Sequence, residues 1–162
     1  MNTKKKNIYI DTNIPMEQQI AFLRQSNLTF QFNTFEVLKE KLGSDGIEIF
    51  KTILRKGYSQ VIKKAKGKSF EEITKVAGIT ERFFGFQTEQ DYTKPDEFQY
   101  SITYCPYLEE CKRRGIGVDF CTIIEDVETE EVSKSLGKVT EPTRMCRGDN
   151  KCTIRMRNTF GR

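Results

Sequence analysis

The residues best suited to carry chemistry are five cysteines, all at or after residue 105 in a chain of 162 residues that contains no histidine. Without imidazole, neither a Cys-His pair nor a Ser-His-Asp triad can form within one chain. Proton transfer must then use a carboxyl, phenol, amine or thiol group. Asp126, five residues after Cys121, is our candidate general base, and a solvated helix charge is its plainer interpretation.

Cys105 directly precedes Pro106, which suits the first position of a helix that runs to about Arg114 and stops at Gly115. Backbone N–H groups and the positive end of a helix stabilise a thiolate at this position. Cys105 is therefore a candidate catalytic nucleophile, with a small capping residue as the alternative. Cys111 falls on the apolar face of the same helix and is expected to be a core residue.

The three remaining cysteines, Cys121, Cys146 and Cys152, are candidate metal ligands. Their irregular spacing lacks the paired C-x-x-C units of a strong zinc signal. A fourth ligand would come from Cys105, Cys111 or Glu141. Thiolate-rich sites suit zinc or an iron–sulfur cluster, so these are the cofactors that we consider.

The stretch "MCRGDNKC" contains two of these candidates on either side of a turn. If Gly148, Asp149 and Asn150 form a three-residue hairpin loop, Cys146 lies directly opposite Cys152. Opposed β-carbons on antiparallel strands are about 4.5 to 5.5 Å apart, near enough to share one ion. A two-residue loop would place the thiols on opposite faces, so their pairing depends on the turn.

Apolar residues with helical spacing predict the elements that must position these thiols. In the first half of the chain, Ser69 and Glu72 form a capping box before a helix. The expected helices span residues 15–26, 33–43, 46–65, 69–78, 106–114 and 119–136.

The spacing changes to two in "EFQYSITY", residues 97–104, which predicts a strand with one apolar face. Residues 82–87 are expected to pair with it, and the polar residues 87–97 to form a linker. Two strands enclose the final cysteine motif, and in the second Cys152, Ile154 and Met156 share a face.

These elements predict a single α+β domain over residues 1–162, with N-terminal helices packed on an antiparallel sheet that ends in a C-terminal β-hairpin. Residues 1–95 are the mainly helical scaffold, and residues 96–162 are the cysteine-bearing α+β part.

Composition restricts the partners. A surplus of 27 − 23 = 4 positive charges is too small to favour nucleic acid. No apolar run reaches the roughly 20 residues of a membrane span. The basic N-terminus is not followed by a signal-peptide core, because Asp11, Asn13 and Pro15 interrupt it. We therefore expect a cytoplasmic protein with reduced thiols that binds a small molecule, either alone or as a homodimer.

The segments "CPYLEECKRRGIG", "FCTIIEDV" and "RGDNKCTIRMR" together resemble the L-2-amino-thiazoline-4-carboxylic acid hydrolase-like family over about residues 104–157. The resemblance implies a hydrolase that opens a C–N bond in a small sulfur heterocycle. The residues that match its motifs are Cys105, Cys121, Asp126, Gly148, Asp149 and Cys152.

The Gly-Asp-x-x-Cys ending is also similar to 4-vinyl reductase domains, an α+β type in which cysteines and a glutamate can hold zinc. This second resemblance implies a non-enzymatic metal-binding or small-ligand sensor domain. Glu141 stands where the glutamate would be expected, and Arg144 stands near the place of a further thiol, so Cys146 would have to replace that thiol.

Overall fold

The computed structural model describes residues 14–159, apart from the side chains of residues 77–79 and 92. The N-terminal segment 1–13, which bears on the signal-peptide question, lies outside the described residues. Within residues 14–159 the chain forms five α-helices, one 3₁₀ helix and four strands. In chain order these are α1 (Met16–Leu42), α2 (Ser44–Ala65), α3 (Phe70–Phe84), β1 (Gln87–Lys94), β2 (Glu97–Tyr104), α4 (Pro106–Arg114), α5 (Asp119–Ser135), β3 (Lys138–Thr143), η1 (Met145–Arg147) and β4 (Cys152–Arg157).

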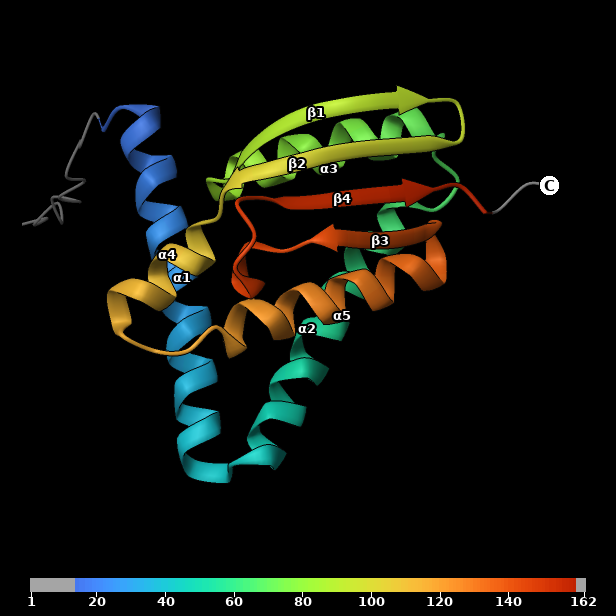
Figure 1. Ribbon diagram of the computed structural model, residues 1–162. Coiled ribbons are helices and arrows are strands. Elements are labelled where there is room, and N and C mark those ends of the chain that lie inside the picture. The colour runs from blue at the N-terminus through green and yellow to red at the C-terminus, as the bar shows by residue number, and fades with distance from the viewer. Residues whose placement is uncertain (1–13, 160–162) are drawn as a thin grey trace, which may run out of the picture.

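The four strands form one antiparallel sheet in the order β1-β2-β4-β3. In Figure 1, α3 lies behind β1 and β2, α5 runs alongside β3, and α1 and α4 lie past one end of the strands. α3 packs against β1, α5 packs against β3, and α2 joins α5 to α1. The α+β class predicted from the sequence is confirmed. None of the helices in the described part of the chain is long and apolar enough to cross a membrane.

The buried side chains form two clusters. The aromatic cluster joins α1, α2, α4 and α5 and contains Phe32, Phe35, Phe50, Cys111, Phe120 and Ile124. The thiol cluster lies where β2 and β4 meet α4, α5 and η1, and it contains Ile102, Cys105, Leu108, Cys121, Cys146 and Cys152. Four of the five cysteines therefore come together, three from separate elements (α5, η1 and β4) and one from the N-terminal cap of α4.

Several helix boundaries follow the sequence signals. The Ser69 side chain accepts a hydrogen bond from the Glu72 N–H, and the Glu72 carboxylate accepts one from the Ser69 N–H, so the predicted capping box is confirmed. Pro106 is the first residue of α4, and Gly115 ends that helix in the left-handed conformation. These signals fix Cys105 at the N-terminus of α4.

The prediction of two helices within residues 15–43 is wrong, because α1 runs without interruption from Met16 to Leu42. The expected cap residues have other partners. Thr34 donates its hydroxyl proton to the Phe30 carbonyl one turn earlier. Asn33 accepts a hydrogen bond from Arg114. A threonine whose hydroxyl binds the preceding turn can continue a helix instead of starting one.

The prediction of a linker at residues 87–97 is also wrong. β1 (Gln87–Lys94) occupies most of it and pairs with β2 through a tight turn. Residues 82–84, expected in a strand, belong to α3. β1 is an edge strand and is largely exposed, so it lacks the apolar alternation by which strands are recognised.

The predicted three-residue hairpin loop does not form. β3 ends at Thr143, which pairs with Thr153, and the chain then turns through η1 before β4 begins at Cys152. Cys146 therefore lies on a 3₁₀ turn and not opposite Cys152 on a strand. The two thiols nevertheless belong to the same cluster.

Gly137 connects α5 to β3 and adopts a φ of 138°. A β-carbon at this position would lie 2.4 Å from the carbonyl oxygen of Arg157, at the end of β4. The close approach excludes any side chain at residue 137 unless the backbone moves. This glycine therefore sets how closely α5 can approach the β3–β4 pair.

Candidate functional site

The cysteine motif after β3 folds back on itself through hydrogen bonds from backbone N–H groups to side chains. The Asp149 carboxylate accepts the Arg144 N–H at 2.8 Å. Gly148 adopts a φ of 97°, a conformation that favours glycine. The Met145 N–H donates to the Cys152 sulfur at 3.2 Å. The Gly-Asp-x-x-Cys sequence thus brings Cys146 beside the first residue of β4.

Glu125 is the point at which three thiols meet. Its carboxylate oxygens lie 3.6 Å from the Cys121 sulfur, 3.3 Å from the Cys146 sulfur and 3.7 Å from the Cys152 sulfur. Cys121 and Glu125 are one turn apart on α5, so they share a helix face. We name Cys121, Glu125, Cys146 and Cys152 the thiol–carboxylate centre.

One ligand atom each from Cys121, Glu125 and Cys146 lies within 4.8 Å of the other two, a spacing at which three groups can share a metal ion. The cysteine side chains are buried, and the Glu125 side chain is 17% exposed. Two sulfurs and one oxygen meet this spacing, and the Cys152 sulfur, 3.7 Å from Glu125, is a candidate for the fourth position of a tetrahedral zinc site.

Cys105 lies at the edge of this centre and caps α4. Its sulfur accepts a hydrogen bond from the Leu108 N–H at 3.5 Å. A hydrogen bond from Cys121, together with those from the Leu108 and Tyr107 backbone, holds the pKa of Cys105 below its ordinary value. Cys105 is thus the thiol most readily present as a thiolate, as its place at a helix N-terminus suggests.

The neighbouring thiols shift in the opposite direction. The hydrogen bond to Cys105 and burial raise the pKa of Cys121. Burial and the negative charge of Glu125 raise the pKa of Cys146, and burial raises that of Cys152 to about 12. These three thiols are neutral near pH 7 and can donate protons to Glu125 and Cys105.

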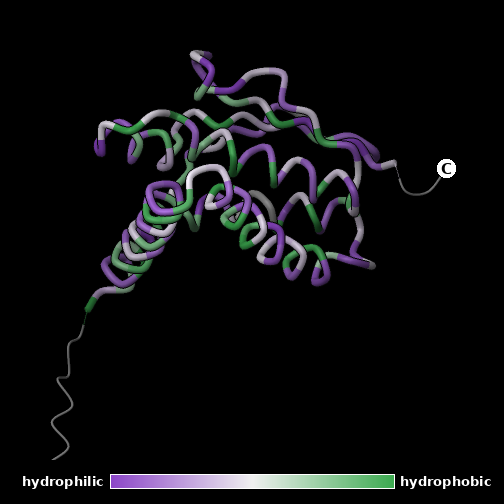
Figure 2. Tube along the Cα trace, turned by 90° about the horizontal axis from the view of Figure 1, so that it is seen from below, coloured by the Kyte–Doolittle hydropathy of each residue, from purple (hydrophilic) through white to green (hydrophobic). Residues whose placement is uncertain are grey.

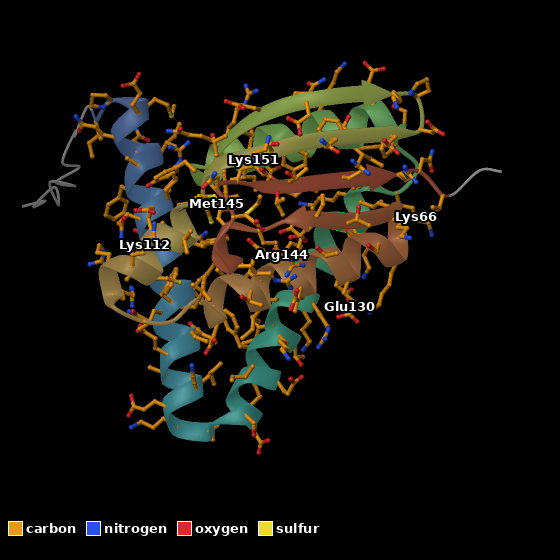
Figure 3. The ribbon with its side chains drawn as sticks, viewed as in Figure 1. Lys66, Lys112, Glu130, Arg144, Met145 and Lys151 are labelled. Atoms are coloured by element: carbon orange, nitrogen blue, oxygen red, sulfur yellow. The ribbon has the colours of Figure 1, made fainter. Side chains whose placement is uncertain are left out.

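Arg144 is the cation beside this centre, and it lies between α5 and the end of β3 (Figure 3). It is 7% exposed. Its guanidinium nitrogens lie 2.5 Å from Asp126, 2.8 Å from Glu141 and 3.7 Å from Glu125. One positive charge therefore faces three carboxylates, so the local balance is negative.

The structure separates the other candidates from the thiols. Asp126 points to Arg144, and its side chain is 56% exposed. Glu141 accepts a hydrogen bond from the Thr129 hydroxyl and is paired with Arg144. Cys111 lies in the aromatic cluster, where burial raises its pKa to about 11, so its predicted place in the core is confirmed. Among the proposed fourth ligands, only Cys105 adjoins the centre.

Five ionisable side chains from five elements form an interior group next to Cys105. They are Tyr58, Glu81, Tyr100, Tyr107 and Glu128, from α2, α3, β2, α4 and α5. Tyr58 donates to the Glu128 carboxylate at 2.9 Å, and Tyr100 donates to Glu81. The negative charges of Glu128 and Cys105 both act on Glu81, which places the group beside the nucleophile candidate.

The members of the interior group are only partly shielded from solvent. Burial raises the pKa of Glu128 to about 7 and that of Glu81 to about 8. The Glu128 side chain is nevertheless exposed, and Glu81 is only half-buried.

Sequence reasoning missed Glu125 and the interior group. The four-residue spacing of Cys121 and Glu125 was the available signal for the first, whereas Asp126, one residue later, points about 100° away around the helix. The interior group has no local signal, because its members are distant in sequence and meet only through packing.

The protein thus has an α+β fold with a buried thiol–carboxylate centre. Beside this centre Cys105, whose pKa is lowered, caps the N-terminus of α4. No protein-family model matches the chain. None of the curated proteins is significantly similar to it.

Proposed function

We propose that the protein is a small cysteine-dependent hydrolase that opens a C–N bond of a thiazoline-type heterocycle, with Cys105 as the nucleophile. The observation that carries the proposal is the contrast among the thiols. The pKa of Cys105 is lowered by Cys121 and by the α4 N-terminus, whereas those of its buried neighbours are raised. An enzyme that lacks histidine needs such a preformed thiolate.

In the proposed reaction the Cys105 thiolate adds to the amidine carbon of the ring, and a C–S bond forms. The ring C–N bond then breaks, and its electron pair goes to nitrogen, which takes a proton. Water attacks the same carbon, the Cys105 thiolate leaves, and the free enzyme is restored. Glu81 is the proposed proton donor, because the charge of Cys105 acts on it and a carboxyl group whose pKa burial raises to about 8 is mostly protonated at neutral pH.

The interior group also suits the charge of such a substrate. An amidine is a base, and its cation pairs well with carboxylates. The hydrogen bonds that Glu81 and Glu128 receive come from tyrosine hydroxyls, which are neutral. A bound amidinium would supply the balancing charge. Asp126 as general base stays a prediction, to be tested with Asp126→Asn in the assay below.

Turnover of 2-amino-thiazoline-4-carboxylic acid, followed by chromatography of the ring-opened product, tests the proposal. Wild-type protein should hydrolyse the compound, and Cys105→Ser should lower the rate by about 1,000-fold or more, since a nucleophile is lost. Cys111→Ser, a change in the aromatic cluster, is the matched control and should keep the activity. Unchanged turnover by Cys105→Ser would exclude this cysteine as nucleophile.

A second candidate function is a metal-binding or small-ligand sensor domain of the 4-vinyl reductase type. Convergence of three sulfurs on Glu125 favours it, as does the excess of carboxylates around Arg144. A carboxylate among the ligands fits zinc better than an iron–sulfur cluster. With this function we also propose the fold of the 4-vinyl reductase domain type. The support is the Gly-Asp-x-x-Cys motif, which this chain carries as Gly148, Asp149 and Cys152.

The two candidates require different states of one sulfur atom. Cys121 donates a proton to Cys105 in the hydrolase, but a zinc ligand must be a thiolate. A chain that holds zinc through Cys121 therefore cannot use the Cys121 proton to stabilise the Cys105 thiolate at the same time. Both fit a cytoplasmic protein with free thiols, which is the compartment that we propose.

Zinc titration of reduced protein against a chromogenic chelator tests the second candidate. One ion per chain should bind, and Glu125→Gln and Cys146→Ser should each weaken binding by at least about tenfold, because each removes a ligand. Asp126→Asn is the control, since Asp126 faces Arg144 and not the thiols. Equal affinity of Glu125→Gln and Asp126→Asn would refute the proposed ligand set.

A further inference from the structure

α1 carries apolar side chains on two opposite faces. One face packs in the aromatic cluster through Phe32 and Phe35, with Leu28 and Leu38 beside them. The other face, which we name the outer stripe, is exposed. It consists of Met16, Leu23, Phe30 and Val37, whose exposed fractions are 68%, 55%, 72% and 54%.

The outer stripe repeats every seven residues over most of the helix. Seven residues make two turns less about 20°, so such residues form a nearly straight line along a helix. This repeat is typical of helices that pair side by side with another helix. A helix that is apolar on both faces is normally covered on both.

The positions beside the stripe also lack charge. Between Met16 and Val37 the side chains beside the stripe are Gln19, Ile20, Ser26, Asn27, Asn33 and Thr34, none of them charged, in a chain of which 31% of residues are charged. Arg114 binds Asn33 at one margin of this face, and Lys41 follows the stripe at its C-terminal end. Charged residues are depleted in the same way at the centres of protein interfaces. A helix face that is permanently exposed to solvent would be expected to carry charged residues.

The size of the stripe matches what a dimer needs. A large apolar side chain offers about 150 to 250 Å² when fully exposed, so the four residues present about 500 Å² per chain. Two copies would bury about 1,000 Å², the lower limit for a specific interface. Figure 2 shows α1 reaching beyond the body of the molecule, with apolar segments along its length.

We propose that the outer stripe of α1 binds the same stripe of a second copy of the chain, in a two-fold symmetric antiparallel pair. In this arrangement Met16 meets Val37 and Leu23 meets Phe30, so the stripe is its own complement, as a two-fold interface requires. Ser26 and Asn27 lie at the symmetry axis, where short side chains let two helices approach closely.

Light scattering during size-exclusion chromatography tests the proposal. Wild-type protein loaded at about 50 μM should elute with twice the 18.9 kDa mass of the chain. Phe30→Glu and Leu23→Glu should each give the mass of one chain, because a carboxylate would be buried against apolar side chains. Gln18→Glu adds the same charge to an exposed position of α1 outside the stripe, and it should remain a dimer.

Circular dichroism of each variant should match the wild-type spectrum, since the changed residues lie outside both buried clusters. A wild-type mass of one chain would overturn the proposal. A dimer that survives both glutamate substitutions would also overturn it, because the interface would then lie elsewhere. The readout is independent of hydrolysis and of metal binding.

Discussion

Iodoacetamide should alkylate Cys105 at least about tenfold faster than any of the other four cysteines at pH 7, because the thiolate is the reacting species. Hydrogen bonds from Cys121 and from the α4 backbone favour this thiolate. The other buried thiols of the cluster remain protonated. Peptide mass spectrometry after a short reaction identifies the modified residue. The four cysteines of the thiol cluster are all buried, with exposed fractions of 8% or less, so a faster reaction of Cys105 would report its thiolate and not its exposure.

The pH dependence of this alkylation has a definite sign. A lowered pKa means that the thiolate persists below the usual thiol value of about 8.5, so the midpoint of the rate profile should lie at lower pH than that value. Cys121→Ser keeps a hydroxyl donor and should shift the midpoint little, whereas Cys121→Ala removes the donor and should raise it. Uniform labelling of all five cysteines in native protein would contradict an activated Cys105.

Arg144→Met should destabilise the fold by about 3 to 5 kcal/mol, the usual cost of removing one partner from a buried ion pair. The Glu141 side chain is 6% exposed and that of Glu125 is 17% exposed, so both carboxylates would lose their cation inside the protein. The Asp126 pair contributes little, because that side chain is 56% exposed. Urea denaturation followed by circular dichroism gives the free energy of unfolding.

Two further variants separate charge from packing in this prediction. Adding Glu141→Gln to Arg144→Met removes a carboxylate that has lost its cation and should recover part of the stability. Arg55→Met breaks pairs with Glu130 and Glu131 at the surface, and its cost should stay below about 1 kcal/mol. Equal costs for Arg144→Met and Arg55→Met would show that the buried pairs contribute no special stability.

The sequence predicted those parts of the site that depend on local signals. A proline after Cys105 and a glycine after Arg114 defined α4, so the cap position of Cys105 followed from two residues. The expectation that Cys121, Cys146 and Cys152 lie together agrees with the thiol cluster, although the hairpin from which part of it was argued does not form. The three thiols meet instead because α5 carries Cys121 and η1 carries Cys146 to the start of β4.

The remaining parts depended on tertiary contacts that leave no pattern in the chain. β1 has the composition of a loop and becomes a strand because β2 offers it a partner. Asn33 and Thr34 are residue types that often begin helices, but here both lie inside α1. Asn33 accepts a hydrogen bond from Arg114, and the Thr34 hydroxyl donates to the Phe30 carbonyl in the preceding turn. The roles of Glu125 and Asp126 differ because adjacent residues on a helix face different directions, and the sequence did not show which direction pointed to sulfur.

Gly137 shows that the thiol–carboxylate centre can be disturbed without a change to any group in it. A methyl group at residue 137 would collide with the carbonyl of Arg157, and relief requires α5 and β4 to separate. Cys121 and Glu125 move with the helix, whereas Cys152 moves with the strand. A side chain at residue 137 would therefore shift the sulfur atoms of α5 and β4 relative to one another. The centre would be distorted although all of its sulfur and carboxylate groups are still present.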